Sequence, residues 1–221
     1  MKILNLYAGI GGNRKLWSDE HEVTAVENNP EIAKIYQDFF PNDNVIVADA
    51  HQFLLEHFQE FDFIWSSPPC QTHSKMRYLA SKRGSYDAKL PDMSLYSQII
   101  FLKHFCKDKK WIVENVKPYY KPLIKPNLQL GRHLIWNNFN IEKKDFNDGL
   151  TNNERGTHNK GIFDLRKFKI KHRKDQIIRN CVIPELGLHI FNCAFKETQS
   201  KLSLDSQKEN SGVDKQELKE Y

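Results

Sequence analysis

Long apolar runs, paired cysteines and internal repeats are all missing from this sequence of 221 residues. No stretch approaches the length of about 20 apolar residues that a membrane-spanning helix needs, and the start, Met1–Gly9, is too short and too glycine-interrupted for a signal peptide. The four cysteines show neither disulfide nor metal-ligand spacing, and Cys70 with His73 has no second pair to complete a metal site. These absences predict a reduced, cytoplasmic setting without membrane contact, bound metal or disulfides.

Positive charge is concentrated in two segments of the chain. Residues 1–60 carry 4 Lys and Arg against 10 Asp and Glu, whereas residues 73–89 carry 5 basic residues and one acid. Residues 155–175 carry 8 basic residues and two acids. Clustered positive charge is typical of proteins that bind a polyanion such as nucleic acid, although a solvated loop face has the same composition.

Short apolar runs alternate with segments suited to helices as far as about residue 136. Strands are expected at residues 2–7, 23–27, 44–47, 61–65, 111–113 and 134–136, and helices at about 8–19, from 30, from 50 and at 94–106. A polar loop is expected between the strand at 61–65 and the helix at 94–106. The alternation predicts an α/β fold with a Rossmann-like, doubly wound, mostly parallel sheet built from right-handed βαβ units.

One of these strands ends at a cysteine. Phe61–Trp65 has the composition of a buried strand, and Pro68 and Pro69 then stop it because neither proline can donate to a neighbouring strand. Cys70 follows, at the edge of the sheet where open α/β proteins bind their ligands. A thiol held there is well placed to act as a nucleophile, although most free cysteines are simply small buried residues.

Glycines and acids occupy the ends of other expected strands. Residues 9–12 hold three glycines, which let the backbone approach a ligand closely. Glu27 ends the second strand, in the position of an acid that binds ribose hydroxyls, and Asp49 follows the third. The plainer alternatives are a surface carboxylate for Glu27 and a helix N-cap for Asp49.

Taken together, these segments resemble the motifs of the cytosine-C5 DNA methyltransferases, in that family's order. The matching segments are L-Y-A-G-I-G-G (6–12), V-E-N-N-P (26–30), A-D-A (48–50), P-P-C-Q (68–71), E-N-V (114–116), G-R-H (131–133) and N-C-V-I-P-E-L-G (180–187). The pair P-P-C-Q and E-N-V, about 40 residues apart, is the most specific part of the match. The short chain is similar to compact members of phages and mobile elements.

The resemblance implies a covalent mechanism at a flipped-out cytosine. Cys70 would add to C6 of the base, which makes C5 nucleophilic towards the methyl group of S-adenosylmethionine. Glu114, kept protonated by burial, would donate to N3 and read the N4 amino group. Arg132 would bind O2 of the base or the nucleophile loop, and Gln71 beside Cys70 completes the implied catalytic set.

The resemblance also implies a site for S-adenosylmethionine. The backbone around the first glycines would meet its methionine end, Glu27 its ribose and Asp49 its adenine amino group. The implied cofactor-binding residues are Tyr7, Ala8, Gly9, Ile10, Gly11, Gly12, Glu27, Asn28, Asp49, Ala50, Pro69, Asn180 and Val182.

The implied partner is double-stranded DNA, since the target carbon is inaccessible until the base is flipped out. Ser74, Lys75, Arg77, Lys82 and Arg83 belong to a basic flap expected over the flipped base. Arg155, Lys169, Lys171 and Arg173 belong to the second basic segment, expected to contact the nucleic acid. A restriction endonuclease as companion, and the oligomeric state, stay open.

The implied domain organisation follows the motifs. Residues 1–136 with 176–196 would form the catalytic domain, with 177–195 mostly helical. Residues 137–175 would be a very small target-recognition region and 197–221 a disordered tail. Two features depart from the family: Leu134 stands where a second arginine is usual, so which family arginine Arg132 replaces is open, and the recognition region is short.

Two other functions stay open beside a DNA methyltransferase. The small recognition region also suits a tRNA cytosine-C5 methyltransferase. A catalytically silent subunit that binds nucleic acid and stimulates a partner is a third reading. The joint presence of Cys70, Glu114 and Arg132 argues against that third reading, because a binding module needs none of them.

Overall fold

The computed structural model describes residues 1–146, 163–171 and 173–196, and within them seven strands form one sheet in the order β3-β2-β1-β4-β5-β7-β6. The strands are β1 (Lys2–Leu6), β2 (Glu22–Glu27), β3 (Asn44–Val47), β4 (Phe63–Ser66), β5 (Lys110–Val116), β6 (Leu128–Leu130) and β7 (His133–Asn137). The first five strands run parallel, and β7 is antiparallel to both β5 and β6. The predicted mostly parallel α/β sheet is confirmed.

The direction of β7 and the presence of β6 were not expected. The connection from β5 to β6 covers only residues 117–127, and its three prolines keep it from forming a helix. β6 runs in the same direction as β5. The two-residue turn at 131–132 then reverses the chain, so that β7 lies between β5 and β6 and antiparallel to both.

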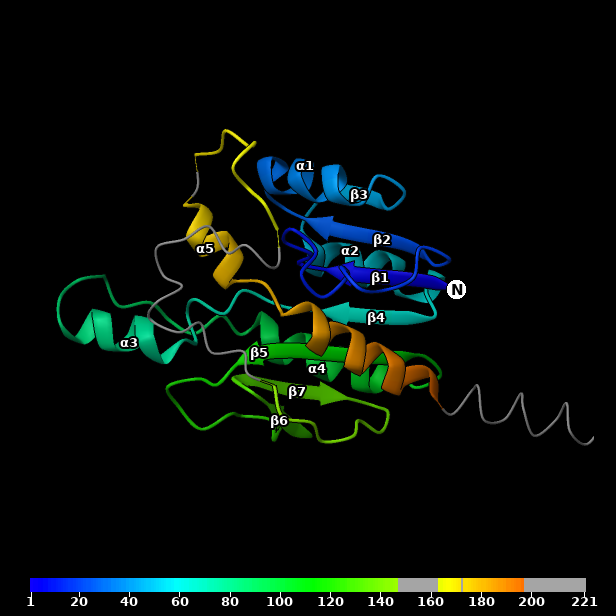
Figure 1. Ribbon diagram of the computed structural model, residues 1–221. Coiled ribbons are helices and arrows are strands. Elements are labelled where there is room, and N and C mark those ends of the chain that lie inside the picture. The colour runs from blue at the N-terminus through cyan, green and yellow to red at the C-terminus, as the bar shows by residue number, and fades with distance from the viewer. Residues whose placement is uncertain (147–162, 172, 197–221) are drawn as a thin grey trace, which may run out of the picture.

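Helices cover both faces of the sheet, as Figure 1 shows. They are α1 (Pro30–Phe39), α2 (Ala50–His57), α3 (Lys75–Lys82), α4 (Ser94–Phe105) and α5 (Lys174–Arg179), with a 3-10 turn η1 (Phe58–Glu60) and a last helix over residues 184–196. α2 and α4 bury Leu54 and Leu102 against one face. Residues 184–196 bury Leu186 and Ile190 against the other, so the sheet is doubly wound as predicted. None of the helices described is long and apolar enough to cross a membrane.

The segment after β1 forms turns over residues 7–19, all of them described, instead of the expected helix. Tyr7, Gly9 and Gly11 have φ angles of 54°, 55° and 83°, in the left-handed region that a right-handed helix excludes. Gly11 is also packed closely, because a Cβ there would lie 2.3 Å from the Phe40 ring. The helix over residues 184–196 packs on the sheet face next to these turns.

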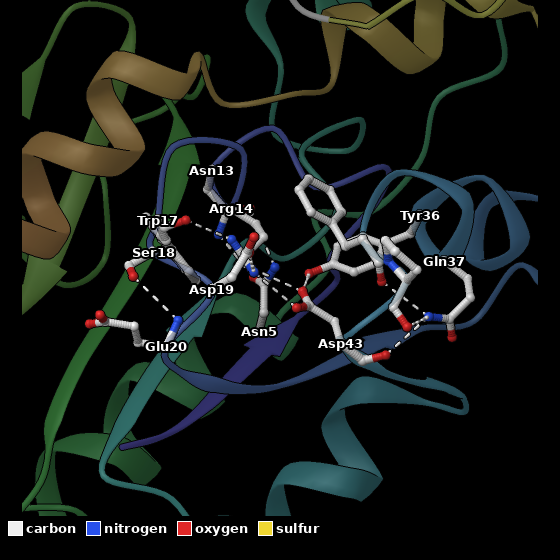
Figure 2. A network of polar contacts seen from close by, with 12 residues as sticks. Asn5, Asn13, Arg14, Trp17, Ser18, Asp19, Glu20, Tyr36, Gln37 and Asp43 are labelled. Carbon is white, nitrogen blue, oxygen red and sulfur yellow. Dashed lines mark hydrogen bonds and ion pairs between the residues drawn. The ribbon is translucent and has the colours of Figure 1, made fainter.

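A buried ion pair fixes these turns to the loop between α1 and β3 (Figure 2). Arg14 donates to both carboxylate oxygens of Asp43 at 3.0 Å, and both side chains are only 2% exposed. The Tyr36 hydroxyl donates to the same carboxylate at 2.8 Å. Asn13 donates to Asn5 of β1 at 2.9 Å. The turns that follow β1 are thus held by side chains because they lack a helix's own hydrogen bonds.

Two further expectations differ from the structure in detail. The loop expected between residues 66 and 92 contains α3. The stretch 177–195 is divided, because α5 ends at Arg179 and the next helix begins at Pro184. Proline fits the first turn of a helix, where its missing N–H would have no partner in any case.

Part of the basic region at 137–175 contributes to the core. Phe163 and Leu165 are buried against α1, in one cluster with Ile35 and Phe40. Lys167 pairs with Asp38 of α1 at 2.5 Å. The expectations for Arg155 and for the tail at 197–221 lie outside the described residues.

Candidate active site

A cavity of about 310 Å³ lies at the carboxyl ends of β1, β2, β4 and β5. Because these strands are parallel, their ends meet at the same edge of the sheet, where α/β proteins bind ligands. The four predicted catalytic residues, Cys70, Gln71, Glu114 and Arg132, line this cavity. Nine of the predicted cofactor-binding residues line it too: Tyr7, Ala8, Gly9, Gly12, Glu27, Asn28, Pro69, Asn180 and Val182.

Four predicted cofactor-binding residues lie outside the lining of this cavity. Ile10 and Ala50 are buried in the core, and Gly11 faces the rings of Tyr36 and Phe40. The Asp49 carboxylate accepts a hydrogen bond from the Gln52 amide at 2.8 Å, so it caps α2. The structure thus shows Asp49 as the N-cap of α2, and its contact with adenine stays a prediction.

Glu27 and Gly9 form one wall of the cavity. The Glu27 carboxylate accepts hydrogen bonds from the Gly9 amide at 3.1 Å and from the Asn29 amide at 2.9 Å. Burial raises the pKa of this carboxyl, and these amides oppose the rise. Each carboxylate oxygen keeps a second lone pair for a ligand hydroxyl. A Cβ built on Gly9 would meet no atom within 4 Å, so this backbone faces open space.

These features fit S-adenosylmethionine. A buried acid at the end of β2 suits a ribose, and the exposed backbone at Gly9 suits the close approach of the methionine end. Gly12 is closed in by the Val182 carbonyl, 2.4 Å from where a Cβ would lie, so the segment after α5 packs directly on the glycine turn.

Tyr7, just before the glycine turn, has a strained backbone with a positive φ angle. A positive φ at a non-glycine residue costs on the order of 1 kcal/mol or more. Gln98 of α4 donates to the Tyr7 hydroxyl and accepts from the Ser66 hydroxyl at 2.6 Å. Burial raises the pKa of Tyr7 to about 12. Tyr7 is therefore a neutral ring anchored from α4, and the glycine pattern alone gave no sign of this anchor.

Cys70 lies in a tight turn between β4 and α3. The Asn115 amide donates to the Pro68 carbonyl at 2.9 Å, which attaches the diproline to β5. The Cys70 carbonyl accepts from the amides of His73 at 3.1 Å and Ser74 at 2.9 Å. The thiol is thus presented to the cavity by a turn fixed on both sides.

The protonation states of Cys70 and Glu114 differ from the expectation. Burial and the nearby Glu114 carboxylate raise the pKa of the Cys70 thiol to about 11. Burial by itself would raise the pKa of Glu114, but His133, with Ser67 and Arg132, outweighs it and the pKa is lowered. The direction of this pKa shift is opposite to the expectation that burial keeps Glu114 protonated, because that expectation omitted the imidazole.

Glu114 lies inside β5, and His133 of β7 bonds to it across the antiparallel pair. Arg132, expected to bind the base or the nucleophile loop, donates to the carbonyls of Arg179 at 2.9 Å and Cys181 at 3.5 Å. It therefore joins the start of β7 to the segment after α5. No role was predicted for His133, although the G-R-H motif contains it.

Those predicted nucleic-acid residues that the structure describes lie outside the cavity lining. Ser74, Lys75, Arg77, Lys82 and Arg83 lie along α3 and its two caps. Tyr78 of α3 stacks on Tyr119 with ring centroids 4.4 Å apart. Arg173 pairs with Asp175 at 2.9 Å. In Figure 1, α3 and α5 both extend beyond the carboxyl ends of the parallel strands.

A family model of C-5 cytosine-specific DNA methylases matches residues 1–129. A tRNA (cytosine(38)-C(5))-methyltransferase of Mus musculus is 30% identical over 82 residues, which is 34% of this chain and 20% of that protein. The enzyme of the same name from Spodoptera frugiperda is 34% identical over 80 residues, 34% of this chain and 24% of that protein. The chain thus matches about a quarter or less of the length of these relatives.

Solved structures match about half of this chain at low similarity. A crystal structure of a Spodoptera frugiperda DNMT2 mutant is 27% identical, covers 52% of this chain and 35% of its own, and has a TM-score of 0.39. A SAM-dependent methyltransferase from Agrobacterium tumefaciens is 13% identical, covers 54% of this chain and 40% of its own, and also has a TM-score of 0.39.

The family match covers more than half of the chain and includes β1 to β5, whose carboxyl ends supply most of the cavity. The methyl donor is S-adenosylmethionine, and the cavity fits it. This chain belongs to the C-5 cytosine-specific DNA methylase family.

Proposed function

We propose that this protein transfers a methyl group to C5 of a cytosine in DNA. The observation that carries the proposal is the shared cavity, in which Cys70, Glu114 and Arg132 lie beside Gly9 and Glu27. A thiol, a buried carboxylate and a cation around one cavity suit an addition to a polar ring. S-adenosylmethionine, bound along Gly9 and Glu27, supplies the methyl group as an electrophilic sulfonium.

Cys70 provides the addition that cytosine chemistry requires. C5 of cytosine is a poor nucleophile until a thiolate adds at C6, and a cysteine thiolate is the strongest nucleophile among side chains near neutral pH. With a pKa of about 11, Cys70 is a protonated thiol at neutral pH. Its proton must therefore leave as the sulfur attacks.

Glu114 is the group that takes up the proton of the Cys70 thiol. N3 of the base gains a proton when the sulfur adds to C6, and the thiol loses one. The lowered pKa of Glu114 makes it a carboxylate, able to take the proton from Cys70 and pass it to N3. The S–H bond breaks, the S–C6 and N3–H bonds form, and no outside acid is consumed.

The nucleic acid would lie across α3. Met76 and Leu90 are 75% and 89% exposed. Their neighbours in the sequence include the basic residues Lys75, Arg77 and Lys89. The Lys82 ammonium lies 5.8 Å from the centre of the Tyr78 ring, so the helix presents an aromatic ring next to a cation. Such a surface suits phosphates together with an unstacked base, and the target base must leave the duplex to reach Cys70.

RNA is the second candidate substrate, and one observation favours it. The relatives that match residues of this chain at 30% and 34% identity are named as tRNA cytosine-C5 methyltransferases. Both substrates require the same addition by Cys70. A catalytically silent binding subunit is the third candidate, and it would not need the thiol at all.

Labelled methyl transfer separates these candidates. Purified protein is incubated with S-adenosylmethionine labelled in its methyl group and either duplex DNA or bulk tRNA. The expected result is label in DNA at 5-methylcytosine, and none with the Cys70→Ala variant. Label in tRNA alone would mean that the substrate is RNA and not DNA. Unlabelled DNA and tRNA, with cofactor binding intact, would mean that the protein is a binding subunit.

A further inference from the structure

His133 and Glu114 form a buried pair across the two antiparallel strands β7 and β5. The strand register pairs His133 with Val116, two residues beyond Glu114, so both side chains lie on the same face of the sheet. His133 Nδ1 bonds to Glu114 Oε1. The residues are 2% and 6% exposed, and both line the cavity with Cys70.

The neighbouring arginine determines which ring nitrogen carries the proton. Arg132 Nε donates to His133 Nε2 at 3.3 Å, so Nε2 accepts. In a neutral imidazole the proton then lies on Nδ1, which donates to the Glu114 carboxylate. Arg132 is itself bonded to the Arg179 carbonyl at 2.9 Å. The hydrogen bonds therefore run from the arginine through the imidazole to the carboxylate.

We propose that His133 is a positioning residue, which holds Glu114 as a carboxylate directed at Cys70 and the base. The role given to Glu114 rests on the proposed function, but the pair itself can be tested without a substrate. His133 would act through Glu114 and not touch the reacting atoms.

Loss of His133 should have opposite effects on two rates: alkylation of the Cys70 thiol should become faster and methyl transfer slower. Besides His133, Ser67 and Arg132 lower the pKa of Glu114, and Arg132 also lowers the pKa of Cys70. Without His133, burial raises the pKa of Glu114 and the carboxyl becomes neutral. The thiol then loses an anionic neighbour, so its pKa falls and it reacts faster with an alkylating reagent. Methyl transfer slows, because Glu114 no longer accepts the thiol proton.

Labelling with iodoacetamide measures the rate at which the Cys70 thiol is alkylated. The variants are His133→Ala, His133→Asn, Glu114→Gln and the double variant His133→Ala with Glu114→Gln. Labelling is followed at Cys70 by mass spectrometry of its peptide from pH 6.5 to 9.5, which separates it from the other three cysteines. Circular dichroism and thermal unfolding check that each variant is folded.

We expect His133→Ala to be labelled roughly 3–10-fold faster than wild type at pH 7.5, as for a thiol whose pKa falls by half a unit to one unit. His133→Asn should stay near wild type, because its amide places a donor near the position of Nδ1. In the Glu114→Gln background, His133→Ala should have no further effect. General damage to the site would instead slow methyl transfer in every variant, without this dependence on Glu114.

An unchanged labelling rate in His133→Ala would overturn the proposal. So would an equal effect of His133→Ala in the Glu114→Gln background. If His133→Ala does not fold, His133→Gln replaces it, because the longer amide places its donor near Nε2 and not Nδ1. Failure of methyl transfer to any nucleic acid would count against the proposed function alone, since labelling needs no substrate.

Discussion

The Asn115 side-chain amide donates to the Pro68 carbonyl at 2.9 Å, and this bond joins β5 to the turn that presents Cys70. Asn115 is 1% exposed, and its own oxygen accepts from the Val116 amide at 3.0 Å. Proline has no backbone N–H to donate to a neighbouring strand. The Pro68 carbonyl is instead attached to β5 by this side-chain donor. Asn115 thus attaches the Cys70 turn to β5, next to Glu114, to which the proposed function gives the proton transfer.

Asn115→Ala should slow methyl transfer while leaving S-adenosylmethionine affinity within a few-fold. The change leaves the buried Pro68 carbonyl unpaired, at a cost of about 1–3 kcal/mol. Urea unfolding measures that loss, and isothermal titration measures cofactor affinity. Asn138→Ala is the matched control, because Asn138 accepts from the Trp111 amide at the opposite end of β5. Equal loss of turnover in both variants would contradict a local role for Asn115.

Cys70→Ala should abolish methyl transfer and leave cofactor binding within a few-fold, because the thiol acts only in the chemical step. The wild-type protein should also form an adduct that survives SDS with DNA containing 5-fluorocytosine. Fluorine at C5 blocks the elimination that would release Cys70. Absence of an adduct, under conditions where methylation proceeds, would rule out addition at C6.

Glu27→Ala should weaken S-adenosylmethionine binding by roughly 10-fold or more, the amount expected when a charged hydrogen-bond partner is lost. The same carboxylate accepts from the Gly9 and Asn29 amides, so the variant should also unfold at a lower temperature. Glu56→Ala on α2, outside the cavity lining, is the control. Glu114→Gln should have the reverse profile, with turnover lost more than affinity, and matching profiles would refute this division of roles.

Arg14→Met should destabilise the protein by about 3–5 kcal/mol, because it leaves the buried Asp43 carboxylate without its cation. Lys167→Met removes the cation of an exposed pair with Asp38 and should cost only about 0–1 kcal/mol. Urea unfolding curves of the two variants test the contrast. A similar small change in both would mean that the pair in Figure 2 is not a buried one in solution.

Neutralising Lys75, Lys82 and Arg83 to alanine should flatten the salt dependence of DNA binding by up to about three phosphate equivalents. Neutralising Lys169, Lys171 and Arg173 should flatten it less, because Arg173 is already paired with Asp175. Affinity measured across a salt series gives both slopes, with cofactor affinity as the control. A slope unchanged by the first set would mean that α3 does not lie on the nucleic acid.

The residues at strand ends could be read from the sequence. Cys70 and Glu27 each follow or close a short apolar run, and in a parallel sheet such ends converge at one edge whatever the details of packing. Asn44–Val47 was located with its bounds because its apolar run is short and flanked by polar residues. The helix expected at 8–19 does not form. Tyr7 and the glycines have positive φ angles, which a right-handed helix excludes.

The partnership between His133 and Glu114 was decided by the tertiary structure. It exists only because β7 runs antiparallel to β5 with His133 opposite Val116, and a strand shifted by one residue would turn His133 to the other face. The sequence determined which chemical groups reach the edge of the sheet, since alternation and strand ends are local properties. Their protonation depends on burial and on partners 19 or more residues away, as between His133 and Glu114, and only the folded chain brings those together.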